Sequence, residues 1–297
     1  MFPIIPANTL VEVAGNTEGI FGYGGGPVSI TNLVSNAGVV ADDTAGVGTA
    51  RSSLAACEYG EDKAIFGFGN DGSETAVTNL VSNAGVVASD QVTATGTARR
   101  ELAACSYGED KGIFGFGYDG SGYVSMTNKV SNSGVVADDT AGVGTVRGFF
   151  AACEYGDDKA IFGFGTSPGT AVTNLVSNAG VVASDQATVT GTARWSLAAC
   201  SYGGDKGIFG FGTTGSLVDT TNLVSNAGVI ASDVTGVGSA RRTLAACEYG
   251  GDKGIFGYGY ISGNVSMTNK VSNSGVVASD VTGVGTGKQY LAACSFN

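Results

Sequence analysis

Apolar and polar positions along the chain recur in blocks that each hold four short runs separated by turns. In one such block, residues 97–144, an apolar run at 101–107 (ELAACSY) precedes a polar turn (GEDK) and a second apolar run at 112–117 (GIFGFG). Alternating positions follow at 124–130 (VSMTNKV), and after another turn a short run stands at 135–138 (VVAD). Short runs of β-forming residues joined by tight turns predict a four-stranded antiparallel sheet, and no window has the 3.6-residue period of a helix.

The block repeats six times with little change in length. Each copy contains Leu-Ala-Ala-Cys or its variant Phe-Ala-Ala-Cys, and the gaps between successive cysteines are 48, 48, 47, 47 and 47 residues: Cys57, Cys105, Cys153, Cys200, Cys247 and Cys294. A period of 40 to 50 residues built from short strands is typical of β-propeller blades. We therefore expect an all-β, six-bladed β-propeller with four antiparallel strands per blade. The alternative is a β-solenoid, whose rungs are usually shorter.

The order of the runs predicts how the ends of the chain meet. The last Ala-Ala-Cys run, residues 290–296, has no Ile-Phe-Gly run after it, and the first Ile-Phe-Gly run, at Ile20, has no good Ala-Ala-Cys run before it. Pairing these two runs would complete one blade and close the ring without an open edge. We expect an N-terminal arm at residues 1–14 and a single propeller domain at residues 15–297, although residues 10–13 could compete for the first-strand position.

The repeat resembles the kelch repeat. Arg-x-x-Leu-Ala-Ala-Cys-x-Tyr, the Gly-x-Asp-Lys turn and Ile-Phe-Gly-Phe-Gly look like the arginine, first strand, turn and second strand of a kelch blade. Thr-Asn-Leu-Val-Ser-Asn and Val-Val-Ala-Ser-Asp stand where its third and fourth strands would be. The resemblance covers nearly the whole chain and implies a kelch-like β-propeller. The repeated phrases are also similar, more faintly, to tandem repeats of phage and environmental-virus structural proteins, which implies a role in a virion.

Composition narrows the partners. The formal net charge of −11 argues against a nucleic-acid partner and against an anionic membrane. No apolar run reaches the roughly 18 to 20 residues that span a bilayer, and the N-terminus lacks the positive region of a signal peptide. We therefore expect a protein without membrane insertion, cytoplasmic or virion-associated, with no nucleic-acid partner.

Two residue types limit the chemistry. Cysteines at equivalent positions of neighbouring blades rarely come within the ~4.4 to 6.8 Å between Cα atoms that a disulfide needs, so we expect six free, buried thiols. The chain has no histidine, which removes the usual general base and the commonest metal ligand. A catalytic set normally breaks repeat symmetry, and no cluster of Asp, Glu, Tyr and Arg is confined to one or two copies. We expect no enzymatic activity.

Two further recurring features have a structural and a functional interpretation. Each copy has a basic residue before its first strand, which we expect to tie neighbouring blades together; the alternative is a cationic ring for an anionic ligand: Arg51, Arg99, Arg147, Arg194, Arg241 and Lys288. The Asp-Lys turns, such as Asp110-Lys111, fit ordinary turn chemistry. Their alternative role is a multivalent surface on one rim.

The residue after each cysteine alternates between glutamate and serine. Glu58, Glu154 and Glu248 alternate with Ser106, Ser201 and Ser295. If these strands are innermost, three carboxylates converge on the central channel and repel one another unless they are protonated, hydrated or bridged by a hard cation. Solvated glutamates left by duplication of a two-blade unit are the main interpretation. A channel cation such as calcium, held by the three glutamates, is the alternative, and we expect no other cofactor.

Positions that differ between copies are the best candidates for binding, because the scaffold does not dictate them. They lie directly after the basic residue and in the loops after Ile-Phe-Gly. Aromatic and basic side chains among them resemble interface anchors, and we select as ligand-binding candidates Arg100, Phe149, Trp195, Arg242 and Tyr290. The sequence favours a non-enzymatic binding or structural propeller that presents variable loops to a glycan or protein partner, as part of a larger assembly such as a phage particle. The alternative is a propeller hydrolase or lyase that uses channel carboxylates.

Overall fold

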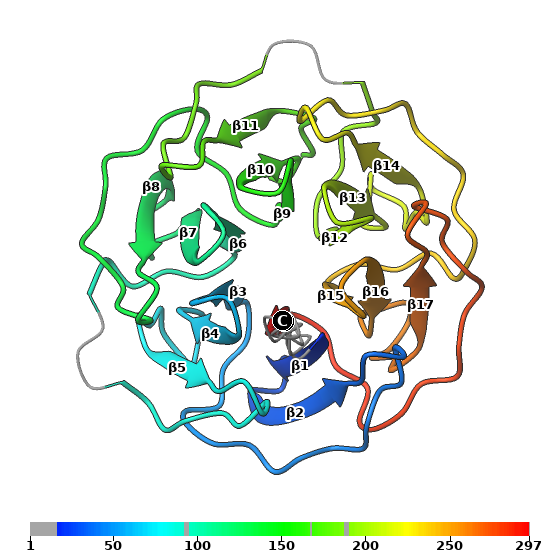
Figure 1. Ribbon diagram of the computed structural model, residues 1–297, viewed down its shortest axis with the longest axis horizontal. Helices are drawn as coiled ribbons and strands as arrows, with labels where there is room; N and C mark the ends of the chain where they lie inside the picture. The colour runs from blue at the N-terminus through cyan, green and yellow to red at the C-terminus, as the bar shows by residue number, and fades with distance from the viewer. Residues whose placement is uncertain (1–16, 92–94, 167, 187–189, 297) are drawn as a thin grey trace, which may run out of the picture.

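The computed structural model describes residues 17–91, 95–166, 168–186 and 190–296. The segment expected to form an N-terminal arm, residues 1–14, lies outside these ranges. Within them the chain is all-β and contains no helix, as predicted. Its strands form six three-stranded antiparallel sheets, which lie around a central opening (Figure 1).

In every sheet the Ala-Ala-Cys strand is nearest the centre, the Ile-Phe-Gly strand is in the middle and the Thr-Asn strand is outermost (Figure 1). The inner strands are β18 (Ala292–Phe296), β3 (Ala55–Tyr59), β6 (Ala103–Tyr107), β9 (Ala151–Tyr155), β12 (Ala198–Tyr202) and β15 (Ala245–Tyr249). The middle strands are β1 (Glu18–Gly24), β4 (Lys63–Gly67), β7 (Lys111–Tyr118), β10 (Lys159–Gly163), β13 (Lys206–Gly210) and β16 (Lys253–Gly257). The outer strands are β2 (Val28–Val34), β5 (Thr78–Val81), β8 (Tyr123–Val130), β11 (Thr173–Val176), β14 (Thr221–Val224) and β17 (Thr268–Val271).

We number the sheets 1 to 6, beginning with the sheet that joins the two ends of the chain. Sheet 1 has the order β18-β1-β2, and sheets 2 to 6 follow in chain order from β3 to β17. Strand β18 pairs antiparallel with β1, from Glu18 opposite Phe296 to Gly22 opposite Ala292. The predicted partnership of the last Ala-Ala-Cys run with the first Ile-Phe-Gly run is therefore present, and β18 takes the first-strand position for which residues 10–13 were the alternative.

The apolar core lies between neighbouring sheets rather than inside any one of them. Ile65 and Phe68 of sheet 2 pack in one cluster with Phe114 and Val130 of sheet 3, and Phe68 meets Phe114 edge to face with ring centroids 5.1 Å apart. Equivalent clusters join each sheet to the next, including sheet 6 to sheet 1. A three-stranded sheet alone buries little surface, so each sheet depends on both neighbours for its stability.

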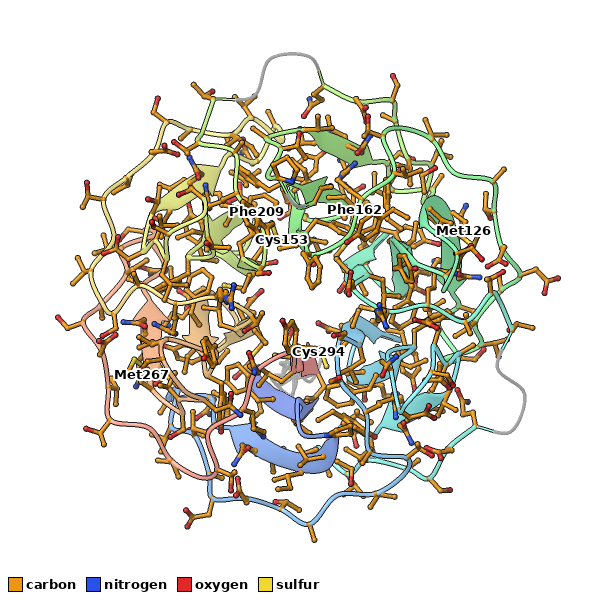
Figure 2. The ribbon with its side chains drawn as sticks, turned by 180° about the vertical axis from the view of Figure 1, so that it is seen from behind. Met126, Cys153, Phe162, Phe209, Met267 and Cys294 are labelled. Carbon is orange, nitrogen blue, oxygen red and sulfur yellow. The ribbon has the colours of Figure 1, made fainter. Side chains whose placement is uncertain are left out.

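The six cysteines are free and buried, which confirms the prediction for the thiols. Figure 2 shows Cys153 and Cys294 close to the central opening, with Phe162 and Phe209 farther out. A cysteine side chain of this set packs against a small residue of the neighbouring sheet. A Cβ added to Gly19 of sheet 1 would lie 2.8 Å from Sγ of Cys247 in sheet 6. The thiol thus occupies space that a small residue leaves between the sheets.

The prediction of four strands per blade is wrong, because each sheet has three strands. The fourth run follows the outer strand but forms only isolated bridges with it, such as Val130 to Val136. The reason is that an asparagine side chain donates hydrogen bonds where backbone N–H groups would donate in a regular ladder. Asn128, in the middle of β8, donates from Nδ2 to the carbonyl oxygen of Ala137 at 3.0 Å and to Oδ1 of Asp139 at 2.9 Å. Side-chain bonding of this kind competes with a regular backbone ladder.

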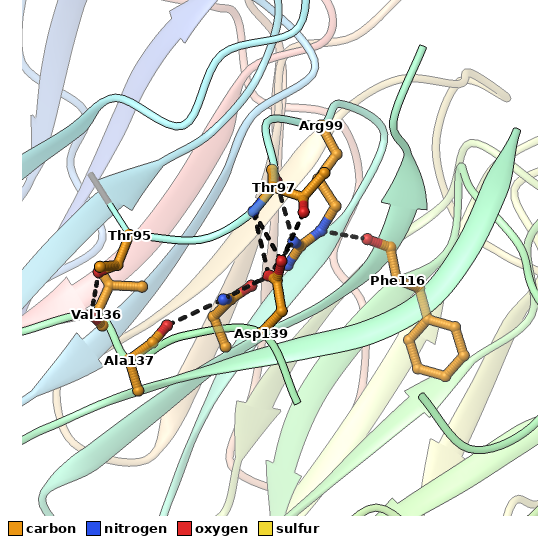
Figure 3. Close-up of polar contacts among 8 residues, drawn as sticks. Thr95, Thr97, Arg99, Phe116, Val136, Ala137 and Asp139 are labelled. Atoms are coloured by element: carbon orange, nitrogen blue, oxygen red, sulfur yellow. Dashed lines mark hydrogen bonds and ion pairs between the residues drawn. The ribbon is translucent and has the colours of Figure 1, made fainter. Parts of the chain in front are cut away.

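A buried layer of basic side chains connects each sheet to the next. The Arg99 side chain is fully buried, and its Cζ lies 4.6 Å from the ring centroid of Phe68 in the preceding sheet. Within its own sheet it donates from Nε to the carbonyl oxygen of Phe116 at 2.8 Å and from Nη2 to Oδ1 of Asn128, while Asp139 lies beside Nη1 at 3.4 Å (Figure 3).

The same arrangement recurs at every junction. The equivalent basic groups lie 4.2 to 4.7 Å from an aromatic ring of the preceding sheet: Arg51, Arg147, Arg194, Arg241 and Lys288. All are buried. Burial lowers the pKa of Arg99 to about 10, although Asp139 opposes that shift. These contacts match the predicted role of the basic residues as ties between blades, and they leave no exposed cationic ring for an anionic ligand.

Candidate functional site

The positions that vary between repeats lie together on one face, because adjacent antiparallel strands bring their ends to the same edge. Backbone hydrogen bonds join the residue after each basic residue to the loop that follows the middle strand. Arg100 N donates to Tyr118 O at 3.0 Å, and Tyr118 N donates back at 2.8 Å. Equivalent bonds join Ser52 to Asn70, Gly148 to Thr166, Trp195 to Thr213, Arg242 to Tyr260 and Gln289 to Gly25. We call this surface the variable face.

The opposite end of the sheets has nearly the same residues in every copy. The Asp-Lys turns lie beside the Ser-Asn turns that follow the outer strands, and Asn132 Nδ2 donates to Oδ2 of Asp110 at 3.1 Å. Matching bonds join Asn178 to Asp158 and Asn226 to Asp205. We call this surface the repeated face. Its Asp and Asn side chains are used in bonding one turn to the next, which supports the turn interpretation of Asp-Lys.

Six residues form a closed ring of backbone hydrogen bonds on the variable face. Each N–H donates to the carbonyl oxygen of the equivalent residue in the preceding sheet, at 2.7 to 3.1 Å. All six have φ between 54° and 58°, the left-handed region that non-glycine residues seldom adopt. We call this set the mouth ring: Ser53, Glu101, Phe149, Ser196, Thr243 and Tyr290. The unusual backbone turns a side chain from each sheet toward the common axis.

A cavity of about 70 Å³ lies inside the mouth ring. Its wall consists of the mouth ring and the next residue of each repeat, an apolar collar of Leu54, Leu102, Phe150, Leu197, Leu244 and Leu291. Phe149 and Tyr290 come from opposite members of the ring, and their ring centroids are 6.4 Å apart with a 48° tilt. The mouth ring therefore supplies two aromatic rings, four hydroxyl groups, including that of Tyr290, and one carboxylate, that of Glu101.

The five predicted ligand-binding residues all reach the variable face, but they separate into two groups. Phe149 and Tyr290 line the mouth cavity. Arg100, Trp195 and Arg242 stand one residue earlier in their repeats, outside the cavity wall and beside the variable loops. Cζ of Arg100 lies 4.8 Å from the Tyr118 ring centroid, and Cζ of Arg242 lies 5.5 Å from that of Tyr260.

One polar cluster was missed from the sequence. Arg100 forms ion pairs with Glu74 at 2.9 Å and with Glu101 at 3.1 Å. Tyr123 donates from its hydroxyl group to Oε2 of Glu101 at 3.2 Å. The expectation that no Glu, Tyr and Arg cluster is confined to one or two copies is therefore wrong. The signal was present: Glu74, Glu101 and Tyr123 all stand at positions where the other repeats have different residues.

Electrostatics favour a binding role for this cluster over nucleophilic chemistry. Burial raises the pKa of Glu101 above its ordinary value, and Arg100 and Tyr123 oppose that shift. Burial, together with the adjacent Glu101, raises the pKa of Tyr123 to about 12. A phenol that holds its proton this firmly acts as a hydrogen-bond donor, whereas an activated nucleophile needs a lowered pKa.

A second cavity of about 70 Å³ lies deeper, where the alternating glutamates and serines meet. Ser295 Oγ donates to Oε2 of Glu58 at 3.0 Å. Burial raises the pKa of Glu154 to about 8, with Glu58 and Glu248 adding to the effect. Burial likewise raises the pKa of Glu248 to about 7. The predicted convergence of Glu58, Glu154 and Glu248 on one cavity is present, and the raised pKa values of Glu154 and Glu248 favour their uncharged forms, which lessens the repulsion.

The cation interpretation of these glutamates stays a prediction. In the part of the chain that the structure describes, no three His, Cys, Asp or Glu side chains are grouped closely enough to hold a metal ion.

Comparisons with known proteins add no family. No protein-family model matches the chain, and no curated protein matches it. The kelch resemblance and the fainter phage resemblance therefore stay predictions. Among the described residues, no helix has the length and apolar character needed to cross a membrane.

Proposed function

We propose that this chain is a six-bladed β-propeller, closed by its C-terminal strand, that binds a glycan or protein partner on the variable face without transforming it. The closed arrangement is supported by the pairing of β18 with β1, by the apolar cluster between sheets 6 and 1, and by the closed mouth ring. A kelch-like family membership and a place in a phage particle are parts of the proposal that rest on sequence resemblance.

The observation that carries the binding proposal is the separation of the two faces. Residues shared by all repeats form the buried layer and the repeated face, whereas differing residues lie on the variable face around one cavity. A rigid repeat scaffold with variable loops at one edge is a common arrangement for recognition. The aromatic residues Phe149, Trp195 and Tyr290 and the basic residues Arg100 and Arg242 supply the side-chain types that dominate binding interfaces.

A second candidate function has one specific observation in its favour. Glu154 and Glu248 have pKa values of about 8 and 7, and a carboxylic acid that keeps its proton near neutral pH can serve as a general acid. This favours a hydrolase or lyase that works in the channel. Replacement of Glu154 by Gln would abolish turnover by such an enzyme.

Glycan and peptide arrays, read for both binding and product release, test these functions. Under the main proposal the protein binds without product release, and Trp195→Ala weakens binding because it removes the largest aromatic side chain of the variable face. Lys159→Ala on the repeated face is the matched control and leaves binding unchanged. Product release that Glu154→Gln removes would establish the second candidate. No binding on either array would identify a purely architectural part and overturn the proposal.

A further inference from the structure

The size of the mouth cavity limits its occupant. Its volume is about 70 Å³. Sites for whole small molecules usually measure ~300 to 1,000 Å³. The cavity is therefore small and open to the surface, and it suits the end of one side chain better than a whole small molecule. This observation favours a protein over a glycan as the source of the group that enters the mouth.

The charge of the lining favours a cation. Among the residues that the structure describes, Glu101 is the only charged one that lines the mouth cavity, and no lysine or arginine lines this cavity or the deeper one. Arg100 is shared between Glu74 and Glu101, which leaves one net negative charge on the three side chains. The whole chain has a formal net charge of −11. A positively charged group approaching along the axis is therefore attracted and meets no basic side chain in the wall.

The remaining lining suits a planar cation with several N–H donors. Phe149 and Tyr290 flank the cavity, and a cation within about 6 Å of an aromatic ring centroid is attracted by the ring. Thr243 donates its hydroxyl hydrogen to the carbonyl oxygen of Arg242 at 2.6 Å, so its lone pairs are available to accept. A guanidinium group stacks on aromatic faces and is more weakly hydrated than an ammonium group.

We propose that the mouth cavity receives the guanidinium end of one arginine side chain from a protein partner, held against the rings of Phe149 and Tyr290 and paired with Glu101. This inference rests on the proposed function, since it assumes that the variable face binds a partner, and it specifies the chemistry that the partner presents. The partner inserts one side chain along the axis, and the surrounding loops contact the area around it.

The test uses small probes with the full chain. N-acetyl-arginine methylamide is titrated against protein with isotope-labelled tyrosine rings, and the Tyr290 signal, assigned through Tyr290→Phe, is followed by NMR. N-acetyl-citrulline methylamide is the matched neutral probe, because it has nearly the same shape without the charge. We expect saturable binding of the arginine probe and at least tenfold weaker binding of the citrulline probe.

Variants locate the binding. Glu101→Gln should weaken the arginine probe at least tenfold and reduce the preference over citrulline, and Phe149→Leu should weaken it about fivefold. Lys159→Ala, on the repeated face and away from the cavity, should change nothing. The urea midpoint of each variant is measured first, and Phe149→Leu serves as the main test if Glu101→Gln fails to fold.

Several outcomes would overturn the inference. Equal binding of the citrulline probe would remove the charge requirement, and equal binding of a lysine probe would remove the preference for guanidinium. An unchanged affinity in Glu101→Gln or Phe149→Leu would place the probe elsewhere. Suppose that a partner found on the arrays binds Trp195→Ala more weakly but binds Glu101→Gln with unchanged affinity. The proposed function then stands, and the inference about the arginine side chain is wrong.

Discussion

Arg99 and Arg100 are neighbours in the chain, yet they belong to opposite regions of the molecule. Arg99 is fully buried between sheets 2 and 3 and recurs as a basic residue in every repeat. Arg100 has 34% of its side chain exposed and stands where the other repeats have Ser, Gly, Trp, Arg or Gln. The comparison separates a buried layer that holds the sheets together from a face that is free to differ. Alterations in the first region should change stability, and alterations in the second should change binding.

The largest expected effect comes from removing the buried cation. Arg99→Met should lower the free energy of unfolding by about 3 to 5 kcal/mol, because the Phe116 carbonyl oxygen, Asn128 and Asp139 lose their partner in a buried site. Arg100→Met is the matched control and should cost less than about 1 kcal/mol, as expected for partly exposed ion pairs. Urea denaturation measures both. Equal losses would show that the two arginines do not belong to different regions.

A smaller loss is expected from polar substitution of a packed thiol. Cys153→Ser should destabilise the protein by about 1 to 3 kcal/mol, because the hydroxyl group is smaller than the thiol and costs more free energy to bury in this apolar site. Burial raises the pKa of the Cys153 thiol, so we also expect no reaction of native thiols with a thiol-specific reagent, followed by reaction of all six after unfolding. Rapid modification of the native protein would contradict the assignment of the cysteines to the buried layer.

The glutamates that line the central channel should make the stability of the protein depend on pH. A glutamate in an unfolded chain titrates near pH ~4.3, whereas Glu154 has a pKa of about 8 when folded. Between these values the folded state binds more protons than the unfolded state, so the free energy of unfolding should fall as the pH rises. Glu154→Gln should flatten the decline between about pH 5 and pH 8, and it should raise the melting temperature at pH 8.

The exposed Asp157→Asn, on the repeated face, is the control for the channel variant. It should alter the slope of stability against pH much less, because its side chain lies in an exposed turn and Asp157 adds less to the raised pKa of Glu154 than burial, Glu58 and Glu248 do. If Glu154→Gln and Asp157→Asn alter that slope equally, the buried carboxylates of the channel do not control it.

The smallest effect is expected on the repeated face. Lys159→Ala removes an ion pair with Asp158 in which the lysine side chain is 42% exposed, and it should change the free energy of unfolding by less than about 0.5 kcal/mol. A clear loss of partner binding in this variant would revive the multivalent-surface interpretation of the Asp-Lys turns. It would also reverse the functional assignment of the two faces.

The parts of the fold that could be predicted are those set by local pattern and by repetition. Runs such as Ile-Phe-Gly and Ala-Ala-Cys became the middle and inner strands, and counting them located the partnership of β18 with β1. The absence of a fourth strand could not be predicted, because it depends on the Asn128 side chain, which donates a hydrogen bond to the carbonyl oxygen of Ala137. The sequence pattern of the run that contains Val136 is the same whether backbone hydrogen bonds or a side chain attach that run to the outer strand.

The candidate site could be predicted only in outline. Variation between copies identified residues that lie together on the variable face, Phe149 and Tyr290 among them. Which of two adjacent variable residues faces the axis depends on a left-handed backbone at the second one, and no glycine marks that position. The contact of Glu101 with Tyr123 spans a loop and two strands, so variation between copies could mark the two residues but could not show that they meet.

The pairing of β18 with β1 has a consequence for how the protein is made on the ribosome. Strand β1 is synthesised long before β18, because the strands of the five other sheets lie between them in the chain. At translation rates of ~5 to 20 residues per second, β1 keeps an unpaired edge on the order of tens of seconds. The first of the six sheets to begin is thus the last to be completed. Every nascent chain passes through an open form whose exposed strand edge can pair with other nascent chains on the same messenger RNA.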